Sequence, residues 1–141
     1  MLPLNLSRLA TITKFEELEV WQLARELAKE IFELFSNSEQ FSRDYKLKDQ
    51  INGSSGSVMD NIAEGFERGG KNEFVHFLSI SKGSCGELRS QIYRALDRNY
   101  ISESVFEKIK KEAEDISGML QGLINYLNKS EIKGTKFKDR V

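Results

Sequence analysis

The stretch that decides the fold is Asn61-Ile62-Ala63-Glu64-Gly65-Phe66, which places an amide, a carboxylate and a glycine in close succession. A spaced set of residues follows it within an otherwise plain amphipathic pattern, at Arg68, Phe74, Phe77-Leu78, Gly83-Ser84 and Glu87-Leu88. A glycine inside a helix costs about 1 kcal/mol relative to alanine, and a carboxylate is rarely buried without a partner. Residues of these kinds therefore indicate a constraint beyond generic helix packing.

The surrounding sequence predicts a chain made almost entirely of helix. Its only proline is Pro3, and a proline inside a helix breaks it. Apolar residues recur at a spacing of three and four in four long segments. The first helix opens with a capping-box spacing over residues 13–16 and ends at residues 36–38, the second covers about 44–66, and the third about 72–98. Ser102 or Ser104 caps the fourth, which continues to Leu127.

Short connections between these helices favour antiparallel neighbours. The expected fold class is therefore all-α, as an antiparallel up-down four-helix bundle. With 141 residues the chain is expected to form one domain. We expect an N-terminal extension over residues 1–13, the bundle over residues 14–129, and a polar, lysine-rich, disordered tail over residues 130–141.

One segment of the second predicted helix has the composition of a flexible linker, namely Asn52-Gly53-Ser54-Ser55-Gly56-Ser57. A helical stripe nevertheless continues through it, because Ile51, Ser55, Val58 and Ile62 keep one face. We therefore expect one continuous helix there.

Composition excludes several classes of protein. The charges of the 21 basic and 22 acidic residues nearly cancel, so the protein has no overall electrostatic field that would attract nucleic acid or an acidic membrane. A single cysteine, Cys85, excludes an internal disulfide framework and a thiolate metal cluster, and we expect it to be a small buried hydrophobe. Residues 1–13 lack the pattern of a signal peptide, and no apolar run could span a bilayer. The expected location is the cytoplasm, without a membrane partner.

Two motifs that could hold a ligand have plainer interpretations. Glu73 and His76 have the Glu-x-x-His spacing of di-iron bundles, but they fall opposite the apolar stripe and His76 is the only histidine. We therefore expect a surface histidine and no metal. Gly69-Gly70 is expected to end the second helix in the left-handed conformation. It is not a phosphate loop, because no strand precedes it and no Gly-Lys-Ser/Thr follows it.

Basic residues gather modestly on the third predicted helix and have two interpretations. Lys71, Lys82 and Arg89 flank its apolar stripe, whereas Arg94 and Arg98 lie one turn apart on its outer face. The plain interpretation is a solvated helix face. The sharper one is a nucleic-acid-binding surface, in which each neutralised phosphate adds salt-dependent affinity.

The remaining polar residues of the deciding stretch and of the set that follows it are Asn61, Glu64, Arg68 and Glu87. Glu64 and Arg68 form an i,i+4 pair of favourable order, worth a few tenths of a kcal/mol. We interpret the four as a polar clasp that fixes the second helix against the third or against a neighbouring subunit. A catalytic carboxylate pair would need a nucleophile, a cofactor motif or a second histidine, and since the sequence shows none of these we expect neither an enzyme nor a cofactor.

Four motifs together resemble those of a known family, namely Leu18-Glu19-Val20-Trp21, residues 61–66 with Arg68, Glu73-Phe74 with Phe77-Leu78, and Gly83-Ser84 with Glu87-Leu88. They are similar to the four-helix-bundle family of 23S rRNA-intervening sequence proteins, to which the accessory variability proteins of diversity-generating retroelements are related. The resemblance extends over residues 15–129. It implies a small, bacterial, non-enzymatic bundle that assembles into a homopentameric ring. The accessory relatives bind nucleic acid and a reverse transcriptase through basic surface on the ring.

The sequence departs from the family pattern just before the deciding stretch. Asn52 and Gly53 follow Gln50-Ile51 where members usually carry two arginines, and Met59-Asp60 replaces the usual Ile-Pro. The resemblance still implies an accessory protein that binds RNA or DNA, with structured RNA as the expected ligand and a reverse transcriptase as a protein partner. The alternative is a homo-oligomeric scaffold that binds a protein without affinity for nucleic acid, which the missing arginines favour.

Overall fold

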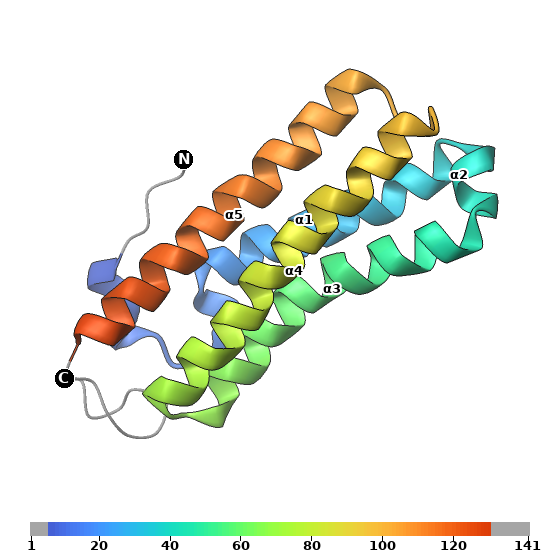
Figure 1. Ribbon diagram of the computed structural model, residues 1–141. Helices are drawn as coiled ribbons and strands as arrows, with labels where there is room; N and C mark the ends of the chain where they lie inside the picture. The colour runs from blue at the N-terminus through green and yellow to red at the C-terminus, as the bar shows by residue number, and fades with distance from the viewer. Residues whose placement is uncertain (1–5, 131–141) are drawn as a thin grey trace.

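The computed structural model describes residues 6–130. Five α-helices and two short 3-10 helices make up this part of the chain, which contains no strand: η1 (Leu6–Thr11), η2 (Phe15–Glu17), α1 (Glu19–Ser36), α2 (Glu39–Arg43), α3 (Tyr45–Arg68), α4 (Lys71–Asp97) and α5 (Glu103–Lys129) (Figure 1). The expectation of an all-α chain is confirmed. Residues 131–141 of the predicted tail and residues 1–5 of the predicted extension lie outside the described residues.

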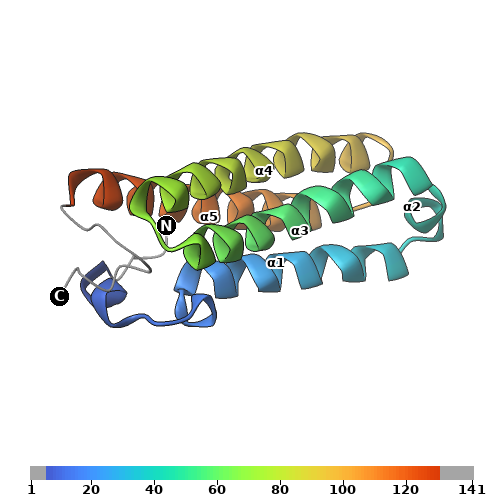
Figure 2. The same cartoon turned by 90° about the horizontal axis from the view of Figure 1, so that it is seen from below.

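The four long helices lie side by side, and the chain direction alternates from each to the next (Figures 1 and 2). The most extensive packing joins α3 to α4, followed by α4 to α5 and α1 to α3, while α1 and α5 share the smallest of these interfaces. The helices therefore form a bundle. Its core is built from buried aliphatic and aromatic side chains, among them Ile31, Ile51, Phe74 and Leu120.

The α3 helix is continuous through residues 52–57, as the apolar stripe predicts. Ser54 and Ser55 face inward and are buried, and their hydroxyl oxygens lie 3.3 and 3.2 Å from backbone carbonyls one turn earlier. Gly53 is exposed on the other side. The hydroxyls of the buried serines therefore have partners, and the linker-like composition does not interrupt the helix.

The start of α1 differs from the predicted capping box over residues 13–16. The carboxylate that caps the turn belongs to Glu17, which accepts hydrogen bonds from the backbone N–H groups of Thr13 at 2.9 Å and Lys14 at 3.1 Å. The capped segment is the short η2, after which Leu18 adopts an extended conformation and is buried. The prediction was wrong because a break at Leu18 separates this cap from α1.

The connection between α1 and α3 contains a helix that the sequence interpretation missed. Ser38 caps α2 by accepting from the backbone N–H of Phe41 at 3.1 Å. Phe41 is fully buried, stacks on Tyr100 with ring centroids 5.1 Å apart, and meets Phe35 edge-on at 4.8 Å. The short α2 therefore closes one end of the bundle over an aromatic cluster.

The other predicted helix ends are confirmed. Gly69 ends α3 with a φ of 90°, a conformation that glycine adopts at little cost. Ser102 caps α5 by accepting from the backbone N–H of Val105 at 3.2 Å. Leu9, in the segment predicted as an extension, is buried against the core.

Candidate nucleic-acid interface

The deciding stretch lies at a tight contact between α3 and α4. A Cβ atom at Gly65 would lie 2.6 Å from the Cβ of Phe77 and 3.1 Å from the Cδ1 of Phe74. Phe66 and Phe74 meet edge-on beside it, with ring centroids 5.9 Å apart. Only glycine leaves room for this packing, so Gly65 is explained by architecture.

Three serine hydrogen bonds join α3 to α4, and the sequence analysis did not identify them. Ser54 donates to the Gln91 side chain at 2.5 Å, and the hydroxyls of Ser84 and Ser57 lie 2.9 Å apart. Ser81, fully buried, donates to the backbone carbonyl of Val58 at 2.6 Å. Serines at core-facing positions of both helical stripes were the available signal, because a buried hydroxyl needs a partner.

Of the four predicted clasp residues, Asn61 and Arg68 lie along this α3–α4 seam, whereas Glu64 pairs with a residue of its own helix. Asn61 donates to both the carbonyl and the hydroxyl of Ser57, each at 2.8 Å, and so joins the serine network. Glu64 and Arg68 pair at 2.8 Å. The Arg68 guanidinium also lies over the Phe77 ring, 5.1 Å from its centroid. Glu87 is exposed and makes no hydrogen bond or ion pair with the described residues.

Three of the five predicted phosphate-binding cations are occupied by partners within the chain. Arg94 donates to the Gln50 side chain at 2.9 Å, and Lys71 contacts the Ser130 carbonyl at 3.4 Å. Arg98 pairs with Asp44 at 2.6 Å. A hydrogen bond from the Tyr100 hydroxyl, together with Arg98, holds the pKa of Asp44 below its usual value. These cations bind α4 to the rest of the chain.

The other two predicted cations, Lys82 and Arg89, line one shallow depression of about 500 Å³ between α4 and α5. Arg89 forms a loose ion pair with Glu114 at 3.5 Å, and its buried Nε has no hydrogen-bond partner among the described residues. The remaining lining residues are small or polar except for Ile124, and they are Ser79, Gly83, Gly86, Ser117, Gln121 and Ile124. We call this depression the α4–α5 groove.

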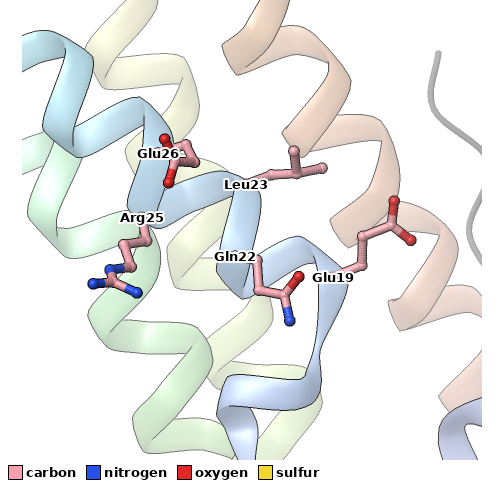
Figure 3. Close-up of a pocket in the computed structure, with 5 residues that line it drawn as sticks. All are labelled: Glu19, Gln22, Leu23, Arg25 and Glu26. Atoms are coloured by element: carbon pink, nitrogen blue, oxygen red, sulfur yellow. The ribbon is translucent and has the colours of Figure 1, made fainter.

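A second depression, of about 440 Å³, lies on the outside of α1. Glu19, Gln22, Leu23, Arg25 and Glu26 line it, and their side chains point in different directions rather than toward a common point (Figure 3). It therefore presents no convergent set of groups for a ligand.

A small charge cluster joins α1 to α5 on another side of the bundle. The Lys108 ammonium lies 3.0 Å from a carboxylate oxygen of Glu30 and 3.3 Å from one of Glu112. The pKa of Glu112 is raised to about 7, mainly because its carboxyl is partly buried and also because it contacts the neighbouring Glu30 carboxyl. This cluster makes the stability of the α1–α5 contact sensitive to pH.

Two potentially reactive side chains, those of Cys85 and His76, are not among the residues that line the α4–α5 groove. Cys85 is fully buried, and burial raises the pKa of its thiol to about 12, which leaves it protonated and inert near neutral pH. His76 is exposed, as predicted. Within residues 6–130 no group of three or more His, Cys, Asp or Glu side chains could hold a metal ion. None of the described helices is long and apolar enough to cross a bilayer.

Comparisons with known proteins agree with the helical architecture. A family model described as 23S rRNA-intervening sequence protein matches residues 16–122. Among solved structures, the chain is similar to a protein of unknown function of the S23 ribosomal protein family from Bacteroides thetaiotaomicron VPI-5482, with a TM-score of 0.69 and 22% identity. The similarity covers 74% of this chain and 97% of that one, and at this identity it supports the fold alone. No curated protein matches the chain.

Proposed function

The chain belongs to the family of 23S rRNA-intervening sequence proteins, and from that membership we propose that it is a non-catalytic accessory protein that binds structured RNA. The observation that carries the proposal is the pair of cations, Lys82 and Arg89, on one groove lined by polar and small residues. Phosphates of the nucleic-acid backbone are the ligands that such cations neutralise.

The proposed assembly is an up-down four-helix bundle that forms a ring-shaped homo-oligomer, a pentamer by resemblance to the family. A ring repeats each groove on every subunit, and repeated weak sites on one molecule raise the overall affinity for a ligand that reaches several of them. This multiplication compensates for a chain whose net charge is only −1. From the resemblance to the accessory variability proteins we propose a reverse transcriptase as a protein partner, and from the composition we propose the cytoplasm as the place of action.

The alternative function is a homo-oligomeric scaffold that binds a protein and has no affinity for nucleic acid. Two observations favour it. Arg94, Arg98 and Lys71 are used within the chain rather than presented to a ligand. Asn52 and Gly53 stand where members of the family usually carry two arginines. A pentamer of this chain would therefore carry ten fewer positive charges at these positions than a pentamer of such a member.

Fluorescence anisotropy with a labelled RNA stem-loop, combined with light scattering to determine the mass, tests the proposal. We expect binding whose affinity falls steeply between about 50 and 200 mM salt, and a mass of a closed oligomer. An affinity that is weak even at the lowest salt, or that does not respond to salt, would contradict RNA binding and favour the scaffold. A monomeric mass would contradict the ring.

A further inference from the structure

We infer that the α4–α5 groove is where this protein holds the phosphodiester backbone of RNA, with the strand lying across Gly83 and Gly86 between Lys82 and Arg89. The inference rests on the proposed RNA-binding function and narrows it to one surface. It divides the five basic residues predicted to bind phosphate, four in α4 and Arg98 at its C-terminal end, into two groups. Lys82 and Arg89 contact phosphate, whereas the other three hold the fold together.

The two cations are placed for successive backbone contacts. Seven residues separate them, which is about two helical turns, or roughly 10 Å along the axis of α4. Both side chains are half-buried, so their stems lie along the protein while their charged ends face the groove. Each cation that neutralises a phosphate releases counterions, so each contributes separately to the salt dependence of binding.

Arg89 has donor capacity that the free protein does not use. Its contact with Glu114 is long, at 3.5 Å, and its Nε has no partner among the described residues. A phosphate oxygen accepts charge-assisted hydrogen bonds from a guanidinium, often two at once. Exchange of the loose Glu114 contact for such a pair is favourable, and Glu114 therefore acts as a competitor of the ligand.

The glycines of the groove have no role in the packing of the chain itself. A Cβ at Gly83 would meet nothing within 4 Å, and one at Gly86 would meet only the Nη2 of Arg89, at 3.9 Å. Gly65 is different, since its neighbours leave no room for a side chain. Glycine weakens a helix relative to alanine, but it also lets another backbone approach closely. The bare helix surface at these two positions provides room for a sugar-phosphate chain.

The opposite wall of the groove completes a surface that recognises a nucleic-acid backbone. Ser117 and Gln121 of α5 supply a hydroxyl and an amide, groups that commonly bind phosphate and sugar oxygens. No aromatic side chain is among the residues that line the groove, so it lacks a platform on which bases could stack. We therefore expect recognition by backbone and shape, with little preference for base sequence.

Two matched pairs of variants test the assignment by anisotropy with the labelled RNA stem-loop. Gly83→Glu adds a carboxylate and bulk to the groove, and Gly53→Glu makes the same change at an exposed glycine of α3 that also has nothing within 4 Å. Glu114→Gln removes the competitor of the ligand, and Glu107→Gln removes an exposed carboxylate elsewhere on α5. The net charge changes equally within each pair.

Gly83→Glu should weaken binding by about tenfold or more and lower the salt slope by about one, while Gly53→Glu changes affinity by less than about twofold. Glu114→Gln should strengthen binding severalfold and Glu107→Gln should not. Equal effects within both pairs would overturn the groove while leaving RNA binding intact. Absence of RNA binding by the unmodified protein would overturn both. The Glu114→Gln arm leaves α4 unchanged, so it decides the matter even if Gly83→Glu fails to fold.

Discussion

Substitution of Gly65 by alanine tests whether the deciding stretch is architectural. The added Cβ would lie 2.6 Å from the Cβ of Phe77, and ordinary contact begins at 3.4 Å, so the helices would have to open by about 0.8 Å. Because the Cβ of Phe77 is fixed to the backbone of α4, no side-chain rotation can relieve the contact. The opening would also loosen the serine hydrogen bonds along the same seam.

The expected magnitude follows from two opposing effects. Overpacking of a well-packed contact costs about 1–3 kcal/mol. Replacing a helical glycine by alanine gains about 1 kcal/mol. A clash between two Cβ atoms that cannot rotate away falls at the upper end of the first range, so Gly65→Ala should destabilise the protein by about 1–2 kcal/mol.

Urea denaturation followed by circular dichroism measures this effect, with Gly53→Ala as the matched control. Gly53 also lies inside α3, but a Cβ there would meet nothing within 4 Å, so its substitution should stabilise the protein by about 0.5–1 kcal/mol. The opposite signs of two identical substitutions in one helix are the decisive result. A Gly65→Ala variant as stable as the unmodified protein would refute the assignment of a packing role to this glycine.

Two further predictions concern stability. Because the folded pKa of Glu112 is raised to about 7 from an ordinary value of 4.5, the folded protein retains a proton that the unfolded chain loses, and stability falls as the pH rises through this interval. Glu112→Gln should therefore leave the free energy of unfolding unchanged at about pH 4 and raise it by about 1–2 kcal/mol at pH 8. This range is reduced for solvent screening, because the side chain is one-third exposed. An effect in thermal melts that does not depend on pH would contradict this prediction. Phe41→Ala should cost about 3–4 kcal/mol in urea denaturation, because it leaves a cavity beneath Tyr100. Phe32→Ala, at a ring that is 62% exposed, should cost less than about 1 kcal/mol, and similar costs for the two variants would argue against a closed aromatic cluster.

The sequence was sufficient to predict the long helices and their order, because each carries a long apolar stripe. It failed where a short segment depends on contacts made elsewhere. The five residues of α2 are too few to show a period, and Phe41 is buried by Tyr100, which is distant in sequence. Choosing Glu17 over Glu16 as the capping carboxylate required knowing that the chain breaks at Leu18.

The sequence was likewise insufficient to predict which residues make up the candidate site. Helical-wheel geometry identified five basic residues on α4, but it could not reveal which of them already had partners on other elements. Arg98 and Arg94 meet Asp44 and Gln50, both more than forty residues away in sequence. The second wall of the groove comes from α5, and no local pattern connects Ser117 to Lys82. Only the packed bundle separates the cations that bond to other parts of the chain from those that line the α4–α5 groove.

Lysine footprinting with and without the RNA stem-loop is the measurement that tests the central claim most directly. The rate of acetylation of each lysine would be followed by mass spectrometry, with Lys29 and Lys46, both exposed on other helices, as internal references. We expect RNA to slow the modification of Lys82 severalfold and to leave the rates at the two reference lysines unchanged. An unchanged rate at Lys82 under conditions where RNA is bound, or equal protection of all three lysines, would contradict the assignment of the phosphate contact to the α4–α5 groove.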